Sequence, residues 1–252
     1  MAVQRSHRLP TSVIPERYEI RLTPDLTQWR FAGEVKIAVQ VHREVREVVL
    51  NAAELAIQAV SMRRPDGGVL HGNAQLDEEN EQALLSFPDT LAPGKYLLQI
   101  QFAGVLNDKL HGFYRSLYKG ADGQDKPLAS TQFESTDARR AFPCWDEPAF
   151  KAVYQVTLVI DEKLTAISNA RVVNETVVKG AGKKAVIFAD SMKMSTYLVA
   201  FIVGEFEATE PVSADGVPLR VLSVPGKKKL ADFAIAIGKA SLEHFSQYYG
   251  IP

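Results

Sequence analysis

The densest group of side chains capable of chemistry lies between residues 130 and 148 of the 252-residue sequence. Four acidic residues, two adjacent arginines, one tryptophan, two phenylalanines and two prolines occur in this one segment. Opposite charges at such short spacing satisfy each other only in a folded, partly buried loop, which the prolines stiffen further. Two interpretations fit: a rigid corner between domains, or one wall of a binding cleft with a carboxylate left unpaired for a cationic ligand. The charged residues are Glu134, Asp137, Arg139, Arg140, Asp146 and Glu147.

The histidines do not form a pattern that could hold a catalytic metal. None is followed directly by Glu, and no pair has the i,i+4 spacing that places two ligands on one face of a zinc-binding helix. The sequence therefore predicts no metal ligand and no catalytic residue within this chain. His244 is expected on the surface of a helix. The five histidines are His7, His42, His71, His111 and His244.

The one cysteine, Cys144, excludes an internal disulfide framework and a thiolate metal site. It stands between Pro143 and Trp145, and nothing in the sequence places a histidine base near it, which favours a packed structural thiol over a nucleophile. Residues 180–184, Gly-Ala-Gly-Lys-Lys, lack the hydroxyl and the first glycine of a phosphate-binding loop, so they are interpreted as a hairpin turn.

Composition narrows the function classes and the partners. A net charge of −1 argues against binding nucleic acid through bulk electrostatics. The longest apolar run, residues 197–203, is much shorter than the ~20 residues of a membrane span, so we expect a buried strand there and no membrane partner. Residues 1–8 lack the apolar core of a secretory signal. A cytoplasmic location is therefore expected, although a secreted protein trimmed of its leader would have the same sequence.

The hydrophobic pattern around the 130–148 segment has mostly a period of two. Residues 34–42 and 96–102 alternate apolar and polar side chains, as strands with one wet face do. Turns containing Gly or Pro separate these and shorter apolar segments, which predicts a mainly-β fold, an antiparallel sandwich or an open, barrel-like sheet. The shorter expected strands are residues 18–22, 45–50, 55–62, 83–87, 152–160, 185–188, 198–203 and 219–224.

Residues 228–249 depart from this pattern, because their apolar residues recur at helical spacing. Gly250 and Pro252 then end the predicted helix. A single amphipathic helix attached to a β domain must bury its apolar stripe, and it is more naturally the first helix of a following domain. The stripe residues are Leu230, Phe233, Ala234, Ile237, Leu242, Phe245 and Tyr249.

The segment 131–148, Thr-Gln-Phe-Glu-Ser-Thr-Asp-Ala-Arg-Arg-Ala-Phe-Pro-Cys-Trp-Asp-Glu-Pro, closely resembles a signature of the zinc aminopeptidases of the aminopeptidase N and puromycin-sensitive type. The likeness extends along most of the chain. Residues 15–26 and 31–35 resemble the opening strands of that family, and residues 193–201 resemble the strand that closes its first domain. Such a long and specific signature makes chance similarity negligible.

The resemblance implies an antiparallel β-saddle N-terminal domain over residues 1–226, followed over residues 227–252 by the first helix of a thermolysin-like catalytic domain. In the family, the catalytic domain carries a Gly-Ala-Met-Glu-Asn motif and an H-E-x-x-H zinc helix, and this sequence contains neither. We therefore expect zinc in a longer parent protein and no cofactor bound by this chain. Its missing catalytic domain is the expected partner, and the 252 residues alone are expected to be inactive.

The resemblance also assigns substrate binding to two residues. Glu134 matches the family's glutamate that helps to bind the free α-ammonium of a peptide, and Gln132 matches the glutamine that lines the first side-chain pocket. A desolvated carboxylate suits an exopeptidase, because it attracts the terminal cation and fixes the position of cleavage. Side chains two apart on an extended segment share a face, so Gln132 and Glu134 can reach one pocket while Phe133 packs behind. Peptides with a free N-terminus are the expected substrates.

Two other function classes remain open. The same fold occurs in catalytically inactive relatives of the family, so the chain could be a peptide- or protein-binding scaffold module, although the intact triplet at residues 132–134 favours the enzyme. A free-standing carbohydrate- or peptide-binding sandwich has only the fold class in its favour. An H-E-x-x-H motif encoded after residue 252 would settle the class.

Overall fold

The computed structural model describes residues 8–251, so the expectations for His7, for the N-terminal segment 1–7 and for Pro252 lie outside the described residues. The chain consists mainly of β-strands with one C-terminal α-helix, which confirms the predicted fold class. It divides into two compact units. The first comprises Met1–Ser116, Ala129–Glu162 and Ala166–Val203, and the second comprises Leu117–Leu128, Lys163–Thr165 and Gly204–Pro252.

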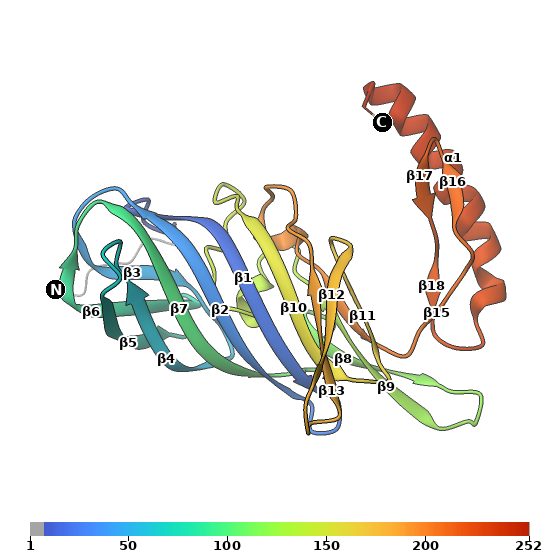
Figure 1. Cartoon of the computed structure of the whole chain (residues 1–252), viewed down its shortest axis with the longest axis horizontal. Coiled ribbons are helices and arrows are strands. Elements are labelled where there is room, and N and C mark those ends of the chain that lie inside the picture. Colours follow the sequence, from blue (N-terminus) through green and yellow to red (C-terminus); the bar gives the residue numbers. More distant parts are fainter. Residues whose placement is uncertain (1–7, 252) are drawn as a thin grey trace. The chain divides into compact units, whose positions relative to one another are not determined.

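A ten-stranded sheet dominates the first unit, in the order β12-β13-β10-β1-β2-β7-β4-β5-β6-β3. Nine neighbouring pairs hold it together, and all are antiparallel except the pair of β1 with β10. Figure 1 shows β1, β2, β7 and β10 curving together side by side. The strands are β1 (Val13–Asp25), β2 (Arg30–Val41), β3 (Val45–Asn51), β4 (Leu55–Arg63), β5 (Val69–Asp77), β6 (Gln82–Leu91), β7 (Gly94–Val105), β10 (Val153–Asp161), β12 (Val172–Val178) and β13 (Lys183–Phe188).

The alternation of apolar and polar residues predicted over residues 34–42 matches the burial pattern of β2. Val35, Ile37 and Val39 are buried, and they pair across to Ile100, Leu98 and Tyr96 of β7. The same ladder pairs each of two glycines with a phenylalanine, Gly33 with Phe102 and Gly104 with Phe31. A Cβ atom on either glycine would lie within 2.4 Å of the facing ring, so a larger side chain would displace that ring.

A second, four-stranded sheet runs in the order β11-β14-β9-β8. Its strands are β8 (Gly112–Lys119), β9 (Asp125–Gln132), β11 (Thr165–Ser168) and β14 (Phe201–Gly204). The strand predicted over residues 198–203 is wrong at its start, because Thr196–Leu198 form a 3-10 turn, η2, and β14 begins only at Phe201. Two hydrogen bonds explain this turn. The Ser195 hydroxyl donates to the Pro148 carbonyl oxygen and the Thr196 hydroxyl donates to Asp146 Oδ1, and both hold the chain in the turn before β14 begins.

The second unit contains two short antiparallel ladders, the 3-10 turn η3 (Lys228–Ala231) and the helix α1 (Asp232–Tyr249). β15 (Glu207–Ala208) pairs with β18 (Leu222–Ser223), and β16 (Val212–Ala214) pairs with β17 (Val217–Leu219). The prediction of one continuous strand over residues 219–224 is therefore wrong. The chain changes partner there, and Val221 exchanges hydrogen bonds with Thr209 between the two ladders.

Helix α1 confirms the predicted C-terminal helix, and it ends at Gly250 in the left-handed conformation, with φ of 66°. No residue of α1 is buried. A Cβ on Gly238 would lie 3.0 Å from Leu219 of β17, so this small-residue side of the helix contacts the β16–β17 hairpin. Larger apolar side chains are exposed: Leu230, Phe233, Ile237, Leu242, Phe245, Tyr248 and Tyr249. Whether this helix starts another domain at residue 227 stays a prediction.

In the described part of the chain, no helix has the length and apolar character needed to cross a membrane.

Candidate functional site

The segment Ser130–Pro148, here called the 130–148 loop, begins in the last residues of β9, where hydrogen bonds fix its backbone. The Thr131 hydroxyl oxygen accepts a hydrogen bond from the Phe201 amide at 3.0 Å and lies 3.3 Å from the Phe201 carbonyl oxygen, to which it donates. The Asp137 amide then donates to the Phe133 carbonyl oxygen at 2.9 Å, and the 3-10 turn η1 (Ala138–Arg140) follows. The two candidate substrate-binding residues, Gln132 and Glu134, therefore lie between a strand end and a turn that are both fixed by hydrogen bonds.

Gln132 and Glu134 are both exposed, whereas Phe133 between them is buried. The Phe133 ring makes edge contacts with Phe142 and Phe201, with centroid distances of 6.0 and 5.8 Å. The Gln132 amide nitrogen lies 3.4 Å from the Glu134 carbonyl oxygen and donates to it. The alternation expected from the sequence is present, with the two polar side chains away from the core and the aromatic ring in it.

The charges of Arg139 and Asp146 meet in the interior. Arg139 donates through Nε to Asp146 Oδ2 at 3.1 Å and through a terminal nitrogen to the Asp146 carbonyl oxygen at 3.2 Å. Its other terminal nitrogen reaches Glu81 at 3.1 Å. Asp146 is 2% exposed, and its Oδ1 accepts a bond of 2.6 Å from the Thr196 hydroxyl. Every oxygen of this buried carboxylate thus has a donor, as a buried charge requires.

Arg140 is held on the other side of the same turn. It donates to Asp137 at 2.8 Å and to Glu54 at 2.8 Å, and it also donates to Glu81. Burial by itself would lower the pKa of Arg140, but the hydrogen bond to Asp137 and the charges of Glu81 and Glu54 outweigh it and raise that pKa above its usual value. The Arg140 guanidinium is therefore always charged, and the carboxylates of Asp137, Glu54 and Glu81 surround it.

Two residues of other strands hold the backbone of the loop. Asn51 of β3 exchanges backbone hydrogen bonds with Cys144, at 2.7 and 3.0 Å, and its side-chain oxygen accepts the Asp146 amide at 3.1 Å. The Tyr18 hydroxyl of β1 accepts the Trp145 amide at 3.1 Å. Sequence reasoning missed both, together with Glu54, Glu81 and Thr196. These partners are far from the loop in sequence, and no local motif connects them to it.

Cys144 agrees with the interpretation of a structural thiol. It is free and fully buried. Desolvation, together with the nearby charge of Asp146, raises the pKa of the thiol well above its usual value. Since the thiolate is the nucleophile, a buried thiol with a raised pKa is inert.

Glu134 differs from the other acids of the loop in having no ionic partner. Asp137 pairs with Arg140, Asp146 with Arg139, and Glu147 with Arg8 at 3.0 Å. Between residues 8 and 251, no arginine, lysine or histidine lies within ion-pair distance of the Glu134 carboxylate. The loop is thus a rigid, internally paired corner that leaves one carboxylate accessible to a cation.

A zinc ion has no fitting donor set in the part of the chain described, residues 8–251. There, no group of three or more His, Cys, Asp or Glu side chains converges closely enough to hold a metal ion. Catalytic zinc needs about three protein ligands. No step of a mechanism is therefore assigned to a metal within this chain.

The fold and the loop together define a class, the mainly-β domain that carries the aminopeptidase signature, and comparison with known proteins identifies the family. Residues 14–198 match the model of the Peptidase M1 N-terminal domain, and the chain belongs to this family.

Three relatives show the extent of the similarity. The chain is 41% identical to puromycin-sensitive aminopeptidase of Caenorhabditis elegans over 99% of its own length and 26% of the relative. It is 44% identical to aminopeptidase M1-D of Oryza sativa subsp. japonica, over 97% of the chain and 28% of the relative. It is 39% identical to "Aminopeptidase 2, mitochondrial" of Saccharomyces cerevisiae, over 96% of the chain and 25% of the relative. The chain thus spans about a quarter of the length of these relatives.

Proposed function

We propose that this M1 N-terminal domain acts within a longer, zinc-dependent aminopeptidase that removes N-terminal amino acids from peptides. The domain caps the active-site cleft, Glu134 binds the free α-ammonium of the substrate, and Gln132 lines the pocket for the first side chain. One observation carries the proposal: no cation among residues 8–251 pairs with Glu134, whereas the other acids of the 130–148 loop are paired, and Glu134 is exposed together with Gln132.

The geometry suits this role because hydrogen bonds fix the backbone of the loop on both sides of Glu134. A charge-assisted hydrogen bond serves as a ruler only if its acceptor is fixed, and the backbone on both sides of Glu134 is held by the Thr131 and Asp137 hydrogen bonds. Glu134 is exposed in this chain, so the desolvation that strengthens its attraction must come from another domain. Zinc and the groups that activate water are assigned to that domain as well.

The partner and the location follow from the same proposal. The exposed apolar side chains of α1 are proposed to pack against the catalytic domain, since apolar surface of this kind is normally covered by a neighbour. The location is proposed to be cytoplasmic. The yeast relative named as mitochondrial makes localisation of the full-length protein in cells the direct check.

The decisive experiment replaces Glu134 by Gln in the full-length enzyme. The variant keeps the shape of the side chain and removes its charge. Loss of a charge-assisted hydrogen bond costs about 1.5–3 kcal/mol, so kcat/KM for substrates with a free amino terminus should fall by about one to two decades. N-acetylated substrates, which are poor from the start, should change little.

Asp146→Asn serves as the structural comparison, because Asp146 is buried in the ion pair with Arg139. The proposal requires Glu134→Gln to lose activity without losing stability. If Glu134→Gln instead leaves kcat/KM for free-amine substrates intact, Glu134 does not bind the ammonium, and the scaffold alternative gains support.

A further inference from the structure

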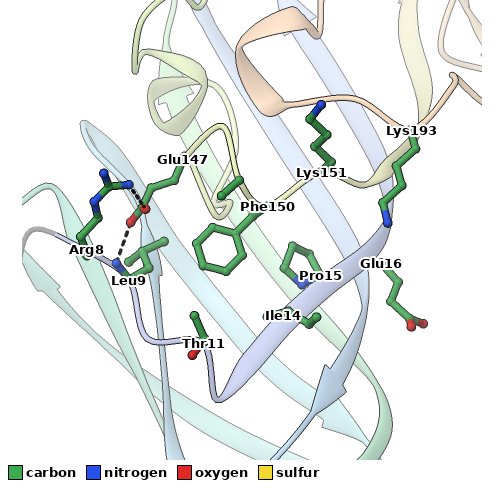
Figure 2. A pocket seen from close by; sticks show the side chains of 11 residues that line it. Arg8, Leu9, Thr11, Ile14, Pro15, Glu16, Glu147, Phe150, Lys151 and Lys193 are labelled. Carbon is green, nitrogen blue, oxygen red and sulfur yellow. Dashed lines mark hydrogen bonds and ion pairs between the residues drawn. The ribbon is translucent and has the colours of Figure 1, made fainter.

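A groove of the first unit lies at the start of β1, where the segment 147–151 also lines it. Its volume is about 770 Å³, within the range of small-molecule sites. Figure 2 shows Arg8 and Leu9 at one side, Phe150 and Pro15 in the middle, and Lys151 and Lys193 at the other side. The remaining lining residues are Thr11, Ile14, Glu16, Glu147 and Ala149.

The groove exists because β1 starts earlier than its neighbour. β1 begins at Val13, but its pairing with β10 begins only at Arg17 with Val153. The ladder of β1 with β2 also shifts register between Pro15 and Arg17. Such an irregularity redirects side chains, and bulges of this kind are common beside binding sites. The first residues of β1 therefore have an open flank, which the segment 147–151 approaches without pairing to it.

The floor of the groove is apolar. Leu9, Pro15 and Phe150 are buried, and Ile14 is half-buried between them. These side chains provide aliphatic and aromatic surface without a hydrogen-bonding group, so they favour an apolar ligand body.

The two lysines are held on the same side by the backbone. Ala152 and Met194 exchange two hydrogen bonds of 3.0 Å each, as an antiparallel pair does. Both of these residues are buried, so the residues preceding them, Lys151 and Lys193, point to the opposite, exposed side. The Ser195 hydroxyl, which donates to the Pro148 carbonyl oxygen at 2.8 Å, ties the same two segments together again.

The acids that line the groove are already neutralised by other partners. Glu147 accepts the Leu9 amide at 2.6 Å and the Arg8 guanidinium at 3.0 Å. Glu16 is paired with Lys95, at 3.3 Å. Among residues 8–251, no acidic side chain forms an ion pair with Lys151 or Lys193. The groove therefore offers two cations beside an apolar floor, and its walls are already joined by hydrogen bonds.

We infer that this groove binds a small organic acid, a carboxylate attached to an apolar or aromatic body, with the body against Phe150, Pro15 and Ile14 and the carboxylate between Lys151 and Lys193. The apolar floor supplies affinity, and the lysines supply the preference for a negative charge. This inference does not depend on the proposed function of Glu134, and the groove contains neither Gln132 nor Glu134.

Titration of the 252-residue chain with 4-phenylbutanoate, followed by calorimetry, tests the inference. Saturable binding with a dissociation constant of roughly 1 mM or tighter is expected for a ligand of this size. The neutral analogue 4-phenylbutan-1-ol should bind about fivefold more weakly, and so should the acid to Lys151→Gln or Lys193→Gln, because an exposed charge pair contributes up to about 1 kcal/mol. Lys179→Gln, which changes an exposed lysine outside the groove, is the matched control and should bind normally.

A variant that fills the groove keeps the test independent of charge. Ala149→Trp places an indole at an exposed lining position, and it should abolish binding while the thermal unfolding temperature is unchanged. Three results would overturn the inference: equal affinity for the alcohol and the acid, equal affinity for inorganic phosphate and the acid, or normal binding of the acid to Ala149→Trp. The absence of any binding of 4-phenylbutanoate would overturn it as well.

Discussion

Arg139 and Asp146 form the buried centre of the 130–148 loop, joined by a side-chain bond of 3.1 Å and by a second bond, of 3.2 Å, to the aspartate carbonyl oxygen. The pair links the first turn of the loop to its last residues. Glu134 takes no part in it. The charged residues of the 130–148 loop are therefore of two kinds. Paired charges such as Arg139 and Asp146 stabilise the loop, whereas Glu134 is exposed on it, so substitutions of the two kinds should change stability differently.

Asp146→Asn is expected to lower the free energy of unfolding by about 3 kcal/mol, because it removes the buried charge that pairs with Arg139 and leaves that guanidinium only the partly exposed Glu81 as an ionic partner. Asp146 is buried, and its Oδ2 accepts hydrogen bonds from both the backbone amide and Nε of Arg139. Urea unfolding of the 252-residue chain, followed by circular dichroism, measures the change.

Glu134→Gln is the matched control in the same experiment. Glu134 is exposed, so its neutralisation should change the unfolding free energy by no more than about 0.5 kcal/mol. Equal losses for the two variants would contradict the division of the loop's charged residues into these two kinds.

Cys144 gives the chain a specific alkaline sensitivity. Burial raises the pKa of the thiol well above its usual value, so the folded chain keeps a proton that the unfolded chain releases above pH ~8.5. The unfolded state then binds fewer protons than the native state, and stability falls as pH rises, by about 1.4 kcal/mol per pH unit from this group. Between pH 9 and pH 10, the unfolding free energy of Cys144→Ala should fall less steeply than that of the parent by this amount.

Thiol labelling provides the second readout of the same prediction. The native chain should react with a thiol reagent at pH 8 only as fast as it unfolds, because Cys144 is fully buried. Tyr18 and Tyr154 also have raised pKa values, caused first by burial, and they add to the loss of stability only above pH ~10. Rapid labelling of folded protein would show that the thiol is accessible.

The strands that show the clearest signal in the sequence are those with one wet face. β2 and β7 alternate buried residues with half-buried or exposed ones over most of their length, so their period is visible without a structure. β12, by contrast, is exposed over almost its whole length, and its residues show no alternation from which a strand could be predicted. The parallel pairing of β1 with β10 was equally invisible, since it joins residues more than a hundred positions apart.

The site shows the same limit. The local spacing sufficed to predict that Gln132 and Glu134 share a face, because that follows from the geometry of an extended segment. It did not suffice to predict which acid stays unpaired. That depends on Glu81 and Glu54, which pair with the two arginines from elsewhere in the fold, whereas no cation among residues 8–251 pairs with Glu134.

The isolated 252-residue chain is expected to hydrolyse no amino-acid amide, with or without added zinc. Its described residues, 8–251, contain no group of side chains that could hold a metal ion. The measurement is the release of a chromogenic amine from leucine p-nitroanilide at increasing zinc concentrations, with a full-length homologous aminopeptidase as the positive control. Zinc-dependent turnover by the purified chain would contradict the assignment of catalysis to another domain.

Helix α1 and the preceding turn η3 carry the last prediction, since their large apolar side chains are exposed: Leu230 of η3 and Phe233 of α1 are 74% and 76% accessible. In the chain by itself, α1 should exchange its amide protons quickly, or the chain should self-associate through this surface. Each large apolar side chain buried in such a contact contributes about 1.5–3 kcal/mol, so Phe233→Ser should weaken self-association by about tenfold or more, as measured by sedimentation equilibrium. Met192→Ser, which removes an equally exposed apolar side chain elsewhere, should leave association unchanged. A strictly monomeric chain with slow exchange along the whole of α1 would show that the helix needs no partner.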